Sequence, residues 1–152
     1  MTMKKLIKKI LEKYLLKGVD TMSFKESLDL AELPVVTFYQ GDKKINFLLD
    51  TGSNNCIIDK NIIDTIDHIP LNMKSNLFGL EGNSQSVDVC QISMFYKERE
   101  YLYQYLIQDM KAPFEAIKKE TGVTLHGILG SKFFNKFKYV LDFAELIAYS
   151  KR

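Results

Sequence analysis

The feature that most limits what this chain can fold into is a short apolar segment ending in an acidic, glycine-containing loop. Residues 45–49 are mostly apolar, and Asp50-Thr51-Gly52-Ser53 follows them directly. The pattern predicts a buried strand and then a tight loop that brings one carboxylate out of the core. An aspartate before a glycine is also typical of an ordinary turn. These nine residues alone leave both interpretations open.

A second segment with a related pattern lies nearer the C-terminal end. The apolar pair Ile128 and Leu129 precedes Gly130, and aromatic residues at helical spacing follow from position 131. Two short strands are then predicted, at 139–143 and 146–149, around a turn at Ala144-Glu145.

Together these segments resemble the retropepsin-like aspartic peptidases, the single-domain family of retroviral type. The resemblance is carried by Asp50-Thr51-Gly52-Ser53, by Ile128-Leu129-Gly130 and by the helix and hairpin after them, and it covers residues 33–149. In retroviral members an arginine follows soon after the glycine that matches Gly130, whereas here Ser131 and Lys132 follow it. The match is therefore closer to the cellular and bacterial branch. The resemblance implies a mainly β fold: a closed acid-protease barrel with a flap hairpin and two or three short helices.

The size and composition of the chain limit its organisation. It has 152 residues, 46% of them hydrophobic, and a formal net charge of +2. This is enough for one domain with a real core and too little for two such lobes. We divide it into a basic amphipathic helix with a linker, residues 1–32, and a peptidase domain, residues 33–152. The near-neutral charge gives no indication of nucleic-acid binding.

Other residue counts bear on redox state and location. Cys56 and Cys90 are too few for a disulfide framework and are expected to be buried free thiols. No run of about 18 apolar residues occurs, so no transmembrane helix is expected. We expect a cytoplasmic protein.

The first 17 residues have their own pattern. Apolar residues recur at helical spacing, and lysines occupy the other face. The lysines interrupt any apolar core that a signal peptide would need. Packing on the domain or on a partner is favoured; a membrane-surface helix is a less favoured alternative, and a disordered or secretion-related segment is a third. Residues 20–32 are expected to form a linker with a short helix within 24–30.

The remaining pattern predicts the elements around the acidic loop. We expect strands at 35–39, 45–49, 56–58 and 101–108, with hairpin turns at 40–43 and 97–100. Asp59 is expected to cap a helix that runs through Ile66. A further helix is expected at 112–120, with Pro113 in its first turn.

The segment from 76 to 95 is expected to form a hairpin. In terms of the family it looks like the flap that folds over the substrate, with Phe78, Gly79, Leu80 and Gly82 at its tip. Glycines there would let the backbone bend and approach a peptide. An ordinary exposed hairpin is the alternative interpretation.

The resemblance also implies the chemistry. Two carboxylates, Asp50 from each subunit of a homodimer, share one proton and activate a water that attacks the peptide bond. Thr51 would lock the two loops together across the two-fold axis, and Gly52 would leave room for the partner and the substrate. Ser53 is expected to donate to the Asp50 carboxylate, which favours an acidic pH optimum. Ile128, Leu129 and Gly130 are expected to pack behind the loop.

No cofactor or metal is expected, and His68 and His126 are interpreted as surface or loop histidines. The expected partners are a protein or peptide substrate and a second copy of the chain. Two other functions stay open at this stage. One is a weakly active or inactive peptide-binding scaffold on the same fold, and the other is a membrane-surface protein that acts through its N-terminal helix.

Overall fold

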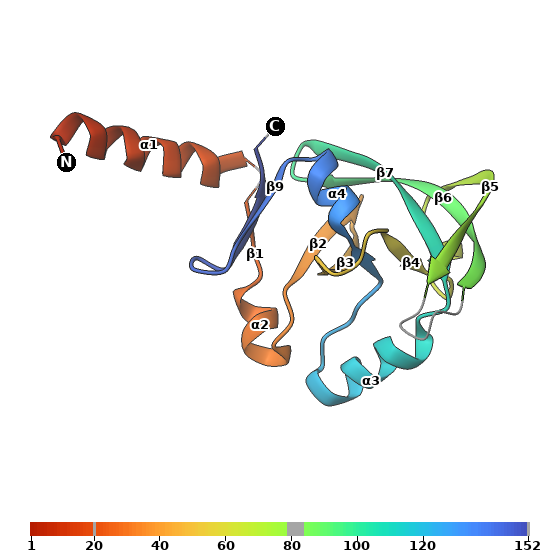
Figure 1. The fold of residues 1–152 in the computed structure, drawn as a ribbon. Coiled ribbons are helices and arrows are strands. Elements are labelled where there is room, and N and C mark those ends of the chain that lie inside the picture. Colours follow the sequence, from red (N-terminus) through yellow and green to blue (C-terminus); the bar gives the residue numbers. More distant parts are fainter. Residues whose placement is uncertain (20, 79–83, 152) are drawn as a thin grey trace.

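The computed structural model describes residues 1–19, 21–78 and 84–151, which form a strand-rich domain with one helix extending from it (Figure 1). The strands follow the β-branched and aromatic runs of the sequence. In chain order the elements are α1 (Met3–Val19), β1 (Met22–Ser23), α2 (Lys25–Ala31), β2 (Val35–Gln40), β3 (Lys43–Leu49), β4 (Ile57–Asp59), the 3₁₀ turn η1 (Ile63–Thr65), β5 (Ile69–Phe78), β6 (Ser84–Tyr96), β7 (Arg99–Gln108), α3 (Lys111–Thr121), β8 (Gly127–Leu129), α4 (Ser131–Lys136), β9 (Tyr139–Asp142) and β10 (Ile147–Ser150).

Seven of the strands form one sheet in the order β2-β3-β8-β4-β7-β6-β5. Strand β2 also pairs with β6, through Tyr39 and Phe95, so the sheet closes on itself. Most neighbours are antiparallel, but β8 runs parallel to β3 and β4 runs parallel to β7. The mainly β, closed fold predicted from the sequence is therefore confirmed.

A smaller sheet pairs the short strand β1, which follows α1, with the C-terminal hairpin of β9 and β10. Its order is β1-β10-β9, with Met22 opposite Ala148 and Ser23 opposite Ile147. Met22 and Phe24 are buried in the main core. This part of the expected linker is therefore integrated into the domain, because its two apolar side chains gain burial beside the C-terminal hairpin. The short helix expected nearby is α2.

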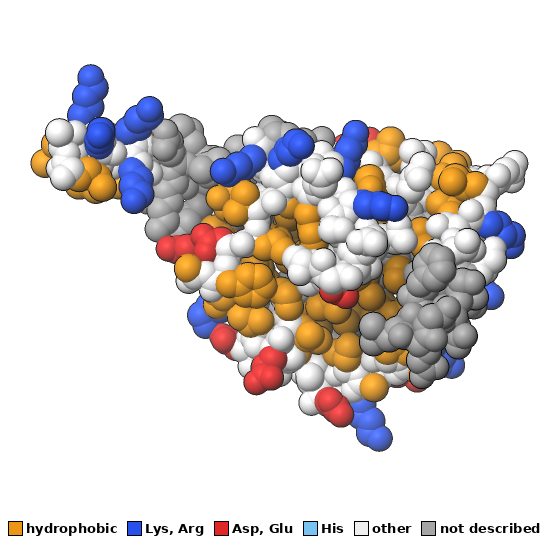
Figure 2. Space-filling view, in the orientation of Figure 1, with side chains coloured by type: hydrophobic (Ala, Val, Ile, Leu, Met, Phe, Trp, Pro, Cys, Tyr) orange, Lys and Arg blue, Asp and Glu red, His pale blue; other side chains and the backbone are white. Residues whose placement is uncertain are grey.

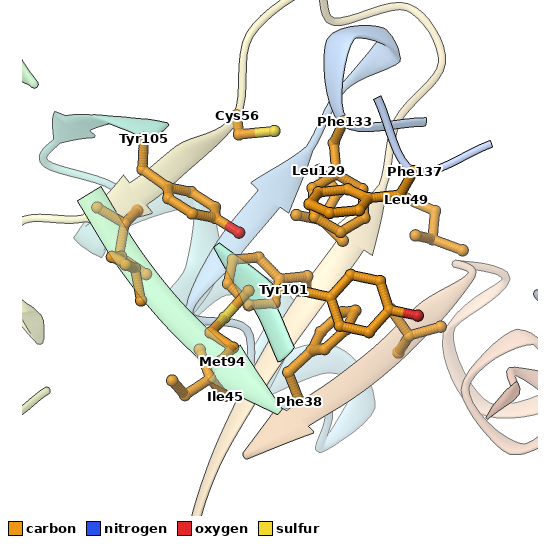
Figure 3. Close-up of a cluster of buried hydrophobic side chains, with 14 of the residues drawn as sticks. Phe38, Ile45, Leu49, Cys56, Met94, Tyr101, Tyr105, Leu129, Phe133 and Phe137 are labelled. Atoms are coloured by element: carbon orange, nitrogen blue, oxygen red, sulfur yellow. The ribbon is translucent and has the colours of Figure 1, made fainter. Parts of the chain in front are cut away.

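The core fills the closed sheet with aromatic and branched aliphatic side chains (Figure 3). Phe133 of α4 lies at its centre, with ring centroids 4.6 Å from Phe137 and 6.0 Å from both Phe38 and Tyr101. Aromatic pairs at such distances add specific contacts to the area that they bury. Helix α4 is thereby fixed against the inside of the sheet, directly after Gly130.

Most of the predicted strands and turns are confirmed, and one helix is not. The helix expected from Asp59 to Ile66 is only the 3₁₀ turn η1. Asp59 instead ends β4, and its buried carboxylate accepts bonds from the backbone N–H groups of Asn61, at 3.2 Å, and Met110, at 3.0 Å. The Asp59 carboxylate therefore links β4 to the start of α3. Its expected role was to cap a helix running to Ile66.

The other expectations about the chain can be checked directly. Cys56 and Cys90 are buried free thiols, as predicted. Helix α3 ends at Gly122, which adopts φ 80°, a conformation suited to glycine. Among the described helices, none combines the length and the apolar character needed to cross a membrane.

Candidate active site

Asp50 lies immediately after β3, where the chain leaves the core. Leu49 is buried, Asp50 is half-buried, and Thr51 and Gly52 are exposed. The backbone N–H of Asp50 still donates to the carbonyl oxygen of Leu129, at 3.0 Å. The ladder between β3 and β8 thus continues up to the acidic residue, and the loop turns outward only after it.

The Asp50 carboxylate is oriented by its own loop. The backbone N–H of Gly52 donates to Oδ1 of Asp50 at 2.9 Å, and the N–H of Ser53 donates to the Asp50 carbonyl oxygen at 3.2 Å. The Ser53 hydroxyl, however, donates to the carbonyl oxygen of Asn55 at 2.8 Å. A hydroxyl has one proton to donate. The expected hydrogen bond from the Ser53 hydroxyl to the Asp50 carboxylate is therefore absent. The acidic pH optimum that was expected from this bond loses its basis.

Strand β8 supports the acidic loop from behind. It lies between β3 and β4, the two strands that flank the loop: Leu49 is opposite Leu129, and Ile57 is opposite Ile128. Leu129 is fully buried. Ile128, Leu129 and Gly130 thus lie behind the loop, and strand pairing holds both of its ends to β8.

Gly130 allows the chain to cross the acidic loop at close range. A Cβ at this position would lie 2.5 Å from the carbonyl oxygen of Asn55 and 2.6 Å from that of Ser53. The next two residues bond to the loop as well: Ser131 N–H donates to the Ser53 carbonyl oxygen at 2.8 Å, and the Lys132 ammonium donates to Oδ1 of Asn55 at 3.0 Å. The loop is therefore held by backbone contacts that tolerate no side chain at position 130.

Sequence reasoning missed two residues that position β8, Gly127 and His126. A Cβ on Gly127 would lie 2.4 Å from the Ile57 carbonyl oxygen. His126, expected at the surface or in a loop, lies in the loop before β8, is half-buried, and accepts the backbone N–H of Asn46 at its Nδ1, at 2.9 Å. The only local signal was their position directly before the apolar triplet. Both residues fix the register of β8 beside β3.

The hairpin of β5 and β6 lies beside the segment that follows the acidic loop. Its strands pair antiparallel up to Phe78 opposite Ser84. The tip residues Gly79, Leu80 and Gly82 lie outside the described residues. A hollow of about 190 Å³ between the hairpin, β7 and the loop is lined by Asn55, Cys56, Met73, Ser75, Val89, Tyr103, Gln104, Leu106 and Lys132. The hairpin's role as a flap stays a prediction.

Metal binding depends on how the side chains that commonly bind metals are grouped in the described part of the chain. No group of three or more His, Cys, Asp or Glu side chains there could hold an ion. Nδ1 of His68 lies 3.0 Å from the carbonyl oxygen of Ile66.

Comparisons with known proteins bear on the fold. The retroviral protease-like domain of Ddi1 from Leishmania major superposes with a TM-score of 0.51 at 12% identity, over 79% of this chain and 89% of that one. This chain has a retropepsin-like fold. EIAV protease in complex with an inhibitor superposes with a TM-score of 0.49 at 16% identity, over 72% of this chain and 92% of that one. A retropepsin-like aspartic protease from Rickettsia conorii gives 0.48 at 15% identity, over 86% and 91%.

The likeness is one of fold. No protein-family model and no curated protein sequence matches the chain. On this retropepsin-like fold, the two motifs singled out in the sequence meet at one site: the Asp50 loop in front and the Ile128–Gly130 segment behind it.

Proposed function

We propose that the protein is an aspartic endopeptidase that acts as a homodimer. The observation that carries the proposal is the position of Asp50. Its carboxylate is held by the Gly52 N–H, its loop is braced from behind by Gly130, and Thr51 and Gly52 are exposed beside it. The site is thus rigid on the inside and open on the outside, where a second copy of the loop would meet it.

The proposed dimer supplies the second carboxylate. The 152 residues contain one Asp-Thr-Gly sequence, so a second copy would supply the other aspartate. Two carboxylates close together cannot both be ionised, so the pair holds one proton. Thr51 would bond across the two-fold axis, and Gly52 would keep the contact region free of side chains. The β5–β6 hairpin would cover the substrate as a flap.

Peptide hydrolysis then needs only the pair and one water. The ionised Asp50 takes a proton from the water as the water oxygen attacks the scissile carbonyl carbon. The protonated Asp50 donates to the developing oxyanion. The tetrahedral intermediate breaks its carbon–nitrogen bond as a proton passes to the leaving nitrogen. The substrate class is a protein or peptide in extended form.

Digestion of a mixed peptide library tests the catalytic role. Asp50→Asn keeps the size of the side chain and removes its ability to ionise. We expect cleavage to fall by about 100-fold or more, with an unchanged free energy of unfolding. Asp42→Asn, in an exposed hairpin turn, is the matched control and should cleave like the wild type. Cleavage that survives Asp50→Asn would refute the proposal. A stable dimer without cleavage would favour the peptide-binding scaffold.

Mixing wild-type protein with Asp50→Asn tests whether two subunits form one active site. If each dimer needs one Asp50 from each chain, an about ninefold excess of Asp50→Asn should lower activity per wild-type chain roughly tenfold after subunit exchange. An equal excess of Asp42→Asn should not lower it. Light scattering gives the mass of each sample. A monomeric catalyst would be unaffected by the inactive chains, and the homodimer would then be excluded.

A further inference from the structure

Helix α1 extends away from the domain (Figure 1), and the side chains described on it, those of residues 3–11, are exposed. Within residues 3–11 the apolar side chains recur at helical spacing, and all are exposed. Their exposed fractions are 43% for Leu6, 50% for Ile7, 49% for Ile10 and 55% for Leu11. The described chain therefore does not cover this face, and the expectation that the helix packs on its own domain is not met over these residues.

The opposite face of the same helix is strongly basic. Lys4, Lys5, Lys8 and Lys9 alternate with the apolar pairs, and Glu12 is the one acidic residue in the sequence of α1. Figure 2 shows these lysines standing out from the end of the helix, with orange apolar atoms beside them. A helix that combines a narrow apolar face with a lysine-rich one has the two features that bind an anionic lipid surface.

We propose that α1 lies on an anionic membrane surface, with Leu6, Ile7, Ile10 and Leu11 inserted among the acyl chains. Lysine stems are long enough to run along the apolar boundary while their ammonium groups reach lipid phosphates and carboxylates. The helix lies in the interface and does not span it. This inference is independent of the proposed peptidase activity, and it would place the domain next to a membrane.

Charge favours an anionic membrane surface over a second copy of the helix as the partner of this apolar face. Pairing two α1 apolar faces would bring lysines from both copies to the edges of the contact. Opposite charges at such edges are what stabilise paired helices. Helix α1 carries six lysines and one acidic residue, Glu12, so two paired copies would bring twelve ammonium groups together with only two carboxylates. An anionic lipid surface supplies negative charge across the whole basic face.

Vesicle flotation with the full-length protein tests the proposal. The probes are vesicles of phosphatidylcholine alone and vesicles that also contain phosphatidylserine. We expect flotation with the second kind only, and release by salt at about 1 M, where charges are screened within about 3 Å. Changing Lys4, Lys5, Lys8 and Lys9 together to Gln should lower binding by at least about 100-fold, since each lysine near such a surface contributes roughly fivefold.

A second variant tests the apolar face. Ile7→Gln combined with Ile10→Gln should also abolish flotation, whereas Leu30→Gln, at an exposed apolar position on α2, should not. Unchanged circular dichroism of the domain and unchanged peptide cleavage would show that each variant is folded. Equal binding to both vesicle kinds, or no binding, overturns the proposal. A mass that rises with protein concentration without vesicles, and falls in the Ile7/Ile10 variant, would instead identify a second copy.

Discussion

Gly130 and Ser53 lie so close that a Cβ at position 130 would be 2.6 Å from the Ser53 carbonyl oxygen. The same carbonyl accepts the backbone N–H of Ser131 at 2.8 Å. The acidic loop and the β8–α4 junction are therefore held together by backbone atoms. Side-chain rotation cannot relieve a clash there, so the loop around Asp50 depends on a glycine about 80 residues away in the sequence.

Gly130→Ala should destabilise the fold. The added methyl group meets two carbonyl oxygens, and the loop must shift to accept it, so we expect a loss of about 3 kcal/mol in the free energy of unfolding. Denaturant titration measures this. Gly52→Ala is the comparison, because its Cβ would meet only the Asp50 Oδ1, at 3.2 Å. That change should cost under about 1 kcal/mol. Equal stability of Gly130→Ala and the wild type would contradict the backbone contact described.

His126 should make stability depend on pH. Burial lowers the pKa of His126 below its ordinary 6.5, Lys43 lowers it further, and Asp59 opposes them. Nδ1 accepts the Asn46 N–H, so the folded state needs the neutral ring. The unfolded chain therefore binds a proton more readily. The contribution of His126 to the free energy of unfolding is fully present above its ordinary pKa. It is lost as the pH falls from that value to the lower pKa of the folded state.

Unfolding measured between about pH 7 and pH 5 checks this dependence. His126→Asn keeps an acceptor near the Asn46 N–H and cannot titrate, so it should lose less stability over that interval than the wild type. Identical pH dependence of the two proteins would show that His126 carries no part of it. His68→Asn serves as the control for a histidine change elsewhere.

Tyr105→Phe should stabilise the protein. The Tyr105 hydroxyl is buried without a hydrogen-bond partner among the described residues, and Figure 3 shows it pointing into the core. Its ring packs 5.7 Å from that of Phe47, a contact that phenylalanine keeps. Removing the unsatisfied hydroxyl should raise the free energy of unfolding by about 1 kcal/mol.

The matched control for this change is Tyr96→Phe. The Tyr96 hydroxyl donates to the carbonyl oxygen of Thr21 at 2.8 Å. Its removal should lower the free energy of unfolding by about 1 kcal/mol. Thermal and denaturant unfolding of both variants give the comparison. A loss of stability in Tyr105→Phe similar to that in Tyr96→Phe would reveal a partner for the Tyr105 hydroxyl in solution.

Both thiols should resist alkylation in the folded protein. Burial raises the pKa of Cys56 to about 11 and that of Cys90 to about 12. The thiolate is the reactive form, so reaction near neutral pH should be very slow. Mass spectrometry after iodoacetamide should find no adduct in the native state and two in denaturant. Rapid native labelling of Cys56 would show that the hollow beside Asn55 opens to solvent.

Local patterns were enough to predict most of the elements and the identity of the loop. Apolar, β-branched and aromatic runs predicted β2 and β3, the helix expected at 112–120 is α3, and Asp50-Thr51-Gly52 with Ile128-Leu129-Gly130 indicated the retropepsin-like fold. Each of these signals is contained in a few consecutive residues, where turn and strand preferences act. The helix expected after Asp59 is only the turn η1, and local pattern gave no sign that the Asp59 carboxylate also bonds to Met110, 51 residues away.

The amino-acid sequence by itself determined where the strands, turns and acidic loop lie, because those depend on neighbours along the chain. Only the tertiary structure decided that β8 enters between β3 and β4, that β2 closes the sheet on β6, and that Met22 joins the C-terminal hairpin. It also decided that Ser53 bonds to Asn55 and that His126 accepts the Asn46 N–H. These outcomes depend on which distant segments bury their side chains and satisfy their hydrogen bonds together, and no local pattern encodes that.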